Sequence, residues 1–174
     1  MISPIIPKPG VLPDSVNVML ADYLGTQKAA IINEWLERVR QDPAITLTET
    51  LTTRALTNHM PEIFEDLIDT LRRYGSEAVA EQSVKDAEEH GATRLQQGYE
   101  LPEMLREIMH FRAILIYHLR HFEDLNPEFG MASRLFISTA LHRFLDEMMI
   151  DATEEYLWSQ LSLQDQIHLG RAKW

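Results

Sequence analysis

The chain of 174 residues contains no cysteine, which excludes disulfides, thiolate metal sites and thiol catalysis. A cytoplasmic location, in a reducing compartment, is therefore the simplest expectation. Basic residues are also scarce, since 16 Lys and Arg stand against 27 Asp and Glu and give a formal net charge of -11 at pH 7. This charge repels phosphate backbones, so nucleic acid is not an expected partner.

Long apolar runs are absent as well. The longest strongly apolar run covers residues 113–117, far short of the roughly 20 residues that a membrane span requires. The opening MISPIIPKPG has neither a basic nor a long apolar region, so no secretory signal is expected. Neither Gly-x-Ser-x-Gly nor a glycine-rich phosphate loop occurs. The sequence thus offers no apparatus for acyl or phosphoryl transfer, and we do not expect an enzyme.

What the sequence does contain is helical periodicity. Its length, with 45% hydrophobic and 25% charged residues, fits one globular domain. No strand alternation accompanies the helical patterns, so we predict an all-α fold of about six to eight helices with a long C-terminal helix. Prolines make residues 1–13 an expected extended arm. Residues 14–162 form the expected helical domain, and residues 163–174 a tail or the start of a linker.

Apolar spacing and capping signals predict these helical segments: 14–42 with a break or kink at Gly25, a short helix near 51–56, 61–73, 77–97, 102–122, and 128 to beyond 160. Gly91 lies inside a helix, where glycine costs about 1 kcal/mol against alanine, so we expect another helix to cross closely there. Gly98 is expected to close the same helix. The last segment exceeds the usual length, so part of it should project or pair with a second copy.

Charged residues fall within the apolar pattern between residues 90 and 112. The helix that follows Gly98 is apolar almost all the way round, so we expect it to lie in the middle of the domain. It would carry four polar side chains inward: Glu107, His110, Arg112 and His118. Charges carried into a core must be paired.

Arg94 and Arg112 therefore have two open interpretations. An intramolecular ion pair would fix how two helices cross, with Glu107, Glu103 or Glu89 opposite. For Arg112, which we expect to be largely buried, the expected partner is Glu107 or a carboxylate on a neighbouring helix. A polar ligand site or a partner contact is the alternative.

A metal site is not predicted. Glu107 and His110 match the Glu-x-x-His spacing of a di-iron centre, but such a centre needs a second motif, and none occurs. His118 and His121 stand three residues apart and His142 could face them. Isolated histidines on packed helices are, however, more often hydrogen-bonded residues of the core or its boundary.

Several short motifs occur in a fixed order: Trp35 to Arg40, His59-Met60-Pro61-Glu62, His90-Gly91 with Arg94, Gly98-Tyr99-x-Leu101, and Leu105-Arg106-Glu107 with Arg112. Over roughly residues 20–155 they resemble the N-terminal sensor domain of RsbR/RsbRD-type proteins, the RsbT co-antagonists. In that family the domain precedes STAS output domains in stress-response regulators and stands at the N-terminus of many bacterial histidine kinases. The resemblance implies a globin-like module that forms a homodimer and relays a signal down its final helix.

The resemblance also bears on haem. In globin-coupled sensors the haem-ligating histidine lies about four residues before the glycine that closes its helix. Here that glycine is Gly98 and the matching position is Arg94, whose guanidinium has no lone pair for iron. His90 lies one turn too early. We therefore expect no haem cofactor, and we expect Arg94 to hold a carboxylate near Tyr99.

Two functions follow from these observations. The first is a non-catalytic signal-transduction module of a stress-response or two-component system, acting on a downstream kinase, STAS or other signalling protein. Its expected ligand or signalling residues are His90, Arg94, Tyr99, Glu107, His110 and Arg112. The second is a globin-type haem or small-molecule binding protein that uses His90 or His110. No STAS, PAS or kinase region occurs in the sequence, so the module either belongs to a longer protein or acts alone.

Overall fold

The computed structural model describes residues 13–73 and 80–171. These form, in order, α1 (Pro13–Gln41), a 3₁₀ helix η1 (Thr46–Glu49), α2 (Thr53–Thr57), α3 (Met60–Arg72), α4 (Ala80–Gln96), α5 (Leu101–Leu125) and α6 (Met131–Arg171). No strand occurs in these two ranges. The predicted all-α domain with a long final helix is confirmed. The predicted arm lies outside the described residues except for Pro13, which begins α1.

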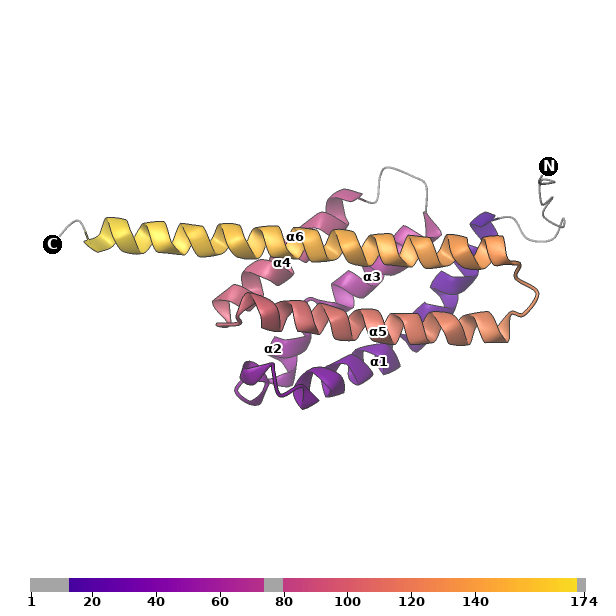
Figure 1. Ribbon diagram of the computed structural model, residues 1–174, viewed down its shortest axis with the longest axis horizontal. Helices are drawn as coiled ribbons and strands as arrows, with labels where there is room; N and C mark the ends of the chain where they lie inside the picture. Colours follow the sequence, from indigo (N-terminus) through magenta and orange to yellow (C-terminus); the bar gives the residue numbers. More distant parts are fainter. Residues whose placement is uncertain (1–12, 74–79, 172–174) are drawn as a thin grey trace, which may run out of the picture.

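The 41 residues of α6 run along the whole length of the molecule, and α5 lies beside α6 in the opposite direction (Figure 1). The helix α6 packs most extensively against α4, whereas α1 packs against α3 and α5. The C-terminal part of α6 extends past the other helices (Figure 1). None of the described helices is both long enough and apolar enough to cross a membrane.

A single core joins the helices. Its largest fully buried apolar side chains include Trp35 of α1, Phe64 of α3 and Phe111 of α5. The helix α3 shows how the sequence builds this core, because its apolar residues recur every three or four positions and all face inward: Met60, Ile63, Phe64, Leu67, Ile68 and Leu71. Pro61 lies in its first turn, as predicted.

Two predictions about helices are wrong. The chain stays helical through Gly25, which is exposed, so of the predicted break or kink the break does not occur. The buried residues Leu24 and Ile31 on either side hold α1 to the core and outweigh the poor helix propensity of a single glycine. The helix α5 is not buried all round, since Met109 and Tyr117 are 58% and 62% exposed. Apolar residues lie nearly all the way round α5, but the neighbouring helices cover only part of its surface, so some of these residues stay exposed.

The prediction for Gly91 is confirmed. A Cβ atom at this position would lie 2.2 Å from the carbonyl oxygen of Ala152. The helices α4 and α6 therefore cross with backbone against backbone, which only a residue without a side chain allows.

Candidate functional site

Two opposite charges lie buried where α4 meets α5. Arg94 lies in the last turn of α4 and Glu107 near the start of α5, and each side chain is only 1% exposed. The Arg94 Nε atom donates a hydrogen bond of 2.6 Å to Glu107 Oε2. Bonds between charged groups are stronger than neutral ones, and in a core each charge depends on the other.

Arg94 also binds α2. Its Nη2 atom donates to the carbonyl of Leu56 at 2.6 Å, and its Nη1 atom donates to the carbonyl of Ala55 at 3.2 Å and to Gln97 Oε1 at 2.8 Å. Because α2 has only five residues, its last carbonyls lack helical partners of their own. One arginine side chain therefore holds α2, α4 and α5 together.

The turn between α4 and α5 places Tyr99 against this arginine. Gly98 ends the helix with a φ of +88°, a conformation that favours glycine, as the sequence predicted. The Tyr99 ring centre lies 5.0 Å from the Arg94 guanidinium carbon, within the range of a cation–π contact. The Tyr99 carbonyl accepts a hydrogen bond of 2.7 Å from the hydroxyl of Tyr156 on α6.

His90 completes what we term the charge cluster: His90, Arg94, Tyr99 and Glu107. The Nε2 atom of His90 lies 3.7 Å from Glu107 Oε2 and has no hydrogen-bond partner. The Tyr99 hydroxyl and Glu107 Oε1 also have no hydrogen-bond partner of normal geometry, although the Tyr99 side chain interacts with the Glu107 carboxylate and lowers its pKa. The cluster thus holds three buried polar atoms without a regular partner, each of which normally costs stability.

Burial also shifts the proton affinities of the cluster. Burial and then the charge of Arg94 lower the pKa of His90 well below its ordinary value, so this imidazole is neutral at pH 7. Burial raises the pKa of Glu107, although Arg94 opposes this shift. Burial and the neighbouring Glu107 carboxylate raise the pKa of Tyr99. The cluster therefore contains a permanent positive charge on Arg94 and a carboxylate, Glu107, whose negative charge is disfavoured by burial.

His110 and Arg112 lie outside the cluster. The Nε2 atom of His110 lies 2.8 Å from Asp42 Oδ2, and Arg112 pairs with Asp146 of α6. Each side chain is 28% exposed, so the expectation that α5 carries them into the core is wrong. Arg112 therefore binds a carboxylate on a neighbouring helix, as one of the expectations had it. Glu107, Glu103 and Glu89 are not its partners, because Arg112 lies on the side of α5 that faces α6. His118 is buried, and its Nδ1 atom lies 3.4 Å from the Tyr23 hydroxyl.

A family comparison accounts for this arrangement of motifs. The model of the RsbT co-antagonist protein rsbRD N-terminal domain matches residues 29–168. The chain belongs to this family. No curated protein and no solved structure matches the chain. As a member of the rsbRD N-terminal domain family, the chain is a regulatory domain of signal transduction.

Sequence reasoning missed several polar residues of this rsbRD-type domain. The Trp35 indole donates a hydrogen bond of 3.0 Å to the Glu107 carbonyl, which adds α1 to the helices around the cluster. Glu103 is buried, closes a capping box with Glu100 and accepts hydrogen bonds from the amide and hydroxyl of Thr46. The Glu100-x-x-Glu103 spacing next to Pro102 was a signal that could have located this cap. No local signal identifies the partner of Trp35.

Metal ligation finds no support in the described ranges. Over residues 13–73 and 80–171 no group of three or more His, Asp or Glu side chains is placed to hold a metal ion. Glu107, half of the Glu-x-x-His motif, binds Arg94 instead, and His110 binds Asp42. In the charge cluster the Glu107 carboxylate is paired with the Arg94 guanidinium, and this pairing does not leave it placed as a metal ligand.

Proposed function

We propose that the chain is a non-catalytic, cytoplasmic sensor module of a stress-response system, and that the charge cluster is its responsive site. The observation that carries the proposal is the burial of Arg94 and Glu107 beside three polar atoms without regular partners. Such a site is stable only while its charges balance, so a proton or a polar ligand that alters this balance changes the packing of α2, α4 and α5. His90, Arg94, Tyr99 and Glu107 are the proposed signalling residues.

Two further predicted residues act at the edge of this site in the proposal. His110 links α5 to Asp42, the residue that directly follows α1, and Arg112 links α5 to Asp146 of α6. Both pairs are partly exposed, and pairs of this kind contribute little to stability. We propose that these two pairs form or break as the helices shift relative to one another, and that neither residue binds a ligand.

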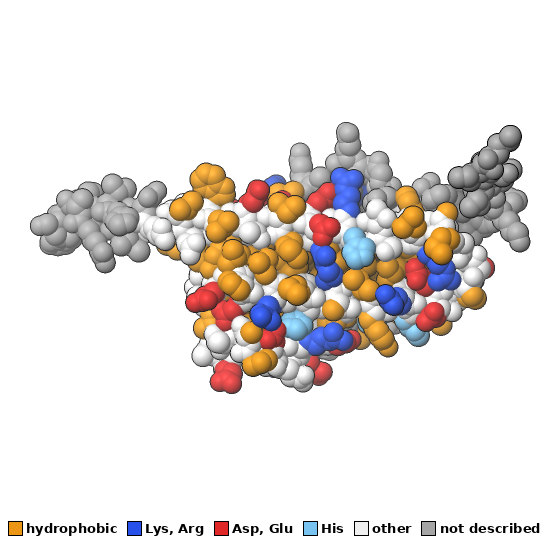
Figure 2. Space-filling model, in the orientation of Figure 1, with side chains coloured by type: hydrophobic (Ala, Val, Ile, Leu, Met, Phe, Trp, Pro, Cys, Tyr) orange, Lys and Arg blue, Asp and Glu red, His pale blue; other side chains and the backbone are white. Residues whose placement is uncertain are grey.

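The proposal includes a homodimer that uses α5 and α6. Hydrophobic side chains gather along the boundary between these two helices on one face of the molecule (Figure 2). The exposed large apolar residues of α6 are Met131, Leu135, Ile150, Leu157, Trp158, Leu161 and Leu163, and those of α5 are Met109, Tyr117 and Leu125. Apolar surface of this extent is typical of a protein interface.

In the proposal α6 passes the signal on. Tyr156 is buried, whereas Leu157, Trp158, Leu161 and Leu163 are exposed. The helix nevertheless continues to Arg171, so residues 163–171 fit a helical linker better than a loose tail. A kinase, STAS domain or separate signalling protein would receive the signal there, as in a two-component or stress-response system. The family description names RsbT, and we propose a protein of that kind as the partner.

Binding to RsbT from the same organism tests this function. Calorimetric titration should show binding, and Glu107→Gln should change the Kd because it alters the charge balance of the cluster. Glu128→Gln, an exposed change, is the control and should leave the Kd unchanged. Failure of the wild-type chain to bind would contradict the proposed partner. An unchanged Kd in Glu107→Gln would contradict the proposed role of the cluster.

The alternative is a globin-type haem or small-molecule protein, favoured by the buried, neutral His90. Against haem, Arg94 and the Tyr99 ring already lie beside Glu107, next to this imidazole. Titration with haemin should therefore give no sharp Soret band. A stoichiometric band that His90→Ala abolishes would establish the alternative and, with it, the globin-like arrangement that the resemblance implies.

A further inference from the structure

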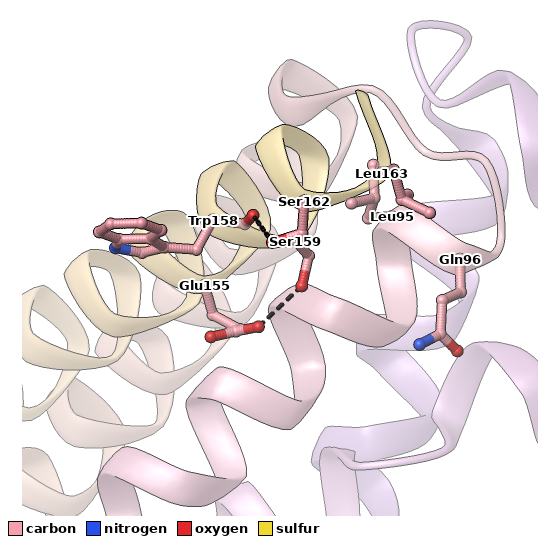
Figure 3. Close-up of a pocket in the computed structure, with 7 residues that line it drawn as sticks. All are labelled: Leu95, Gln96, Glu155, Trp158, Ser159, Ser162 and Leu163. Carbon is pink, nitrogen blue, oxygen red and sulfur yellow. Dashed lines mark hydrogen bonds between the residues drawn. The ribbon is translucent and has the colours of Figure 1, made fainter. Parts of the chain in front are cut away.

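The point at which α6 leaves the other helices borders an open groove. This groove of about 440 Å³ separates the end of α4 from α6, and it is lined by Leu95, Gln96, Glu155, Trp158, Ser159, Ser162 and Leu163 (Figure 3). The polar side chains on its α6 wall bond within α6. Ser159 donates to Glu155 Oε1 at 2.7 Å and Ser162 donates to the Trp158 carbonyl at 3.0 Å (Figure 3). Because both bonds join residues of α6, neither ties α6 to α4 across the groove, and other contacts must fix the width of the groove.

Tyr156 lies directly before this segment and is 3% exposed. Its hydroxyl donates a hydrogen bond of 2.7 Å to the Tyr99 carbonyl. Tyr99 is in turn fixed to the charge cluster, since its amide donates to the Arg94 carbonyl at 3.0 Å and its ring contacts the guanidinium. Up to residue 164, as far as burial along α6 is described, Tyr156 is the last buried side chain, and it binds a member of the charge cluster.

A second contact lies one helical turn earlier on α6. The Ala152 carbonyl is so close to Gly91 that a Cβ atom there would lie 2.2 Å away. Gly91 directly follows His90 in the sequence. Because backbone meets backbone, α6 cannot move closer to α4 at this point, which makes the crossing a pivot for the segment of α6 that follows. The contact at Tyr156 then decides the direction in which residues 157–164 point.

We propose that Tyr156 is a positioning residue: through its hydrogen bond to Tyr99 it makes the course of α6 beyond the crossing at Gly91 depend on the charge of Glu107. When Glu107 is neutral, the guanidinium of Arg94 loses its counter-charge and the turn at Tyr99 shifts. The Tyr156 hydroxyl follows the Tyr99 carbonyl, and the groove changes width. This inference rests on the proposed function and names the contact through which the cluster would act on α6.

Spin-label distances across the groove test the proposal. The chain has no cysteine, so Gln96→Cys and Leu163→Cys supply two unique labelling sites on opposite walls. Labelled protein is diluted with unlabelled protein so that only distances within one chain are recorded. Glu107→Gln should shift the distance by about 1–2 Å, the scale of helix shifts in switching proteins. Adding Tyr156→Phe, which removes only the hydroxyl, should abolish that shift.

Tyr23→Phe is the matched control, because it removes a hydroxyl that faces His118 far from the groove. The shift caused by Glu107→Gln should persist in that background. If Glu107→Gln does not fold, Tyr99→Phe perturbs the cluster in its place and leaves the carbonyl that Tyr156 binds. An equal shift with and without Tyr156→Phe would overturn the role of Tyr156 but leave a relay through α6 standing. No shift in any background would overturn both this inference and the relay.

Discussion

At the level of single residues, Arg94 and Glu107 show how a charge can hold a helical domain together. Each is nearly inaccessible to solvent, and Arg94 also binds the carbonyls of Ala55 and Leu56. Replacing a buried ion pair by apolar residues is often neutral, whereas removing one member is strongly destabilising. The pair therefore contributes more to the specificity of packing than to net stability.

Arg94→Met should lower the free energy of unfolding by about 3–5 kcal/mol, because it leaves the Glu107 carboxylate buried without a counter-charge. Adding Glu107→Gln should recover part of this loss. Urea titrations of both variants measure the effect. Arg72→Met is the control, since Arg72 pairs with Asp22 at the surface and such pairs contribute about 0–1 kcal/mol. Equal losses in the two arginine variants would contradict the buried pair.

Asp66 gives the protein a dependence on pH. Burial, with the hydrogen bond and negative charge of Asp86, raises the pKa of Asp66 from 3.8 to about 7. The folded state therefore binds this proton more tightly than the unfolded chain does. The resulting stabilisation is complete below pH 3.8 and is lost as the pH rises through 7.

Asp66→Asn should therefore gain stability relative to the wild type as the pH rises from 5 to 8, because the amide needs no proton to stay neutral. Urea titrations across this range measure the difference. Asp124→Asn, an exposed change at the end of α5, should follow the wild-type curve. Parallel curves for Asp66→Asn and the wild type would show that the carboxyl titrates normally.

At the level of the helices, two glycines with the same local cost have opposite roles. Gly25 in α1 is exposed, and a Cβ atom there would meet nothing within 4 Å. Gly91 in α4 lies against the backbone of Ala152 in α6. Helix propensity alone makes both positions unfavourable for glycine by about 1 kcal/mol. Only the crossing of α6 explains why Gly91 is required.

Gly91→Ala should destabilise the protein by about 1–3 kcal/mol, since the two helices must move apart to admit a methyl group. Gly25→Ala should instead stabilise it by up to about 1 kcal/mol. For a domain of this size each kcal/mol changes the Tm by about 2–4 °C, which thermal unfolding resolves. A Tm that rises in both variants would show that α4 and α6 do not cross so closely.

At the level of the whole molecule, the face formed by α5 and α6 is where the proposed homodimer would form. Apolar residues of α6 such as Ile150 and Trp158 are 56% and 68% exposed, and α6 continues beyond the other helices. A two-fold dimer would use the same face of both copies. Such a dimer would bring both α6 helices together where the signal leaves the domain.

Ile150→Glu with Leu157→Glu should convert the proposed dimer into a monomer of 20.1 kDa, because the introduced carboxylates would meet across the interface. Both residues are exposed, so the fold of a single copy should survive. Light scattering measures the mass, and Met19→Glu at an exposed position of α1, outside the proposed interface, is the control. A wild-type chain of monomer mass at tens of micromolar would rule out the dimer.

The sequence by itself determined the helices and the turns between them. The spacing of apolar residues, Pro61 in a first turn and Gly98 after a last turn act over three or four positions, so they can be read along the chain. The need of Arg94 for a carboxylate could also be predicted, because a guanidinium keeps its charge when it is buried.

Only the tertiary structure decided which faces of the helices are covered. The pattern of α5 predicts burial all round, yet solvent contacts Met109, and Arg112 reaches Asp146 instead of the interior. Glu107 binds Arg94 and Trp35, which are 13 and 72 positions away in the sequence. The burial of a side chain and the identity of its partner depend on contacts between segments that are distant in the sequence. A periodicity of three or four residues describes one helix only and cannot predict those contacts.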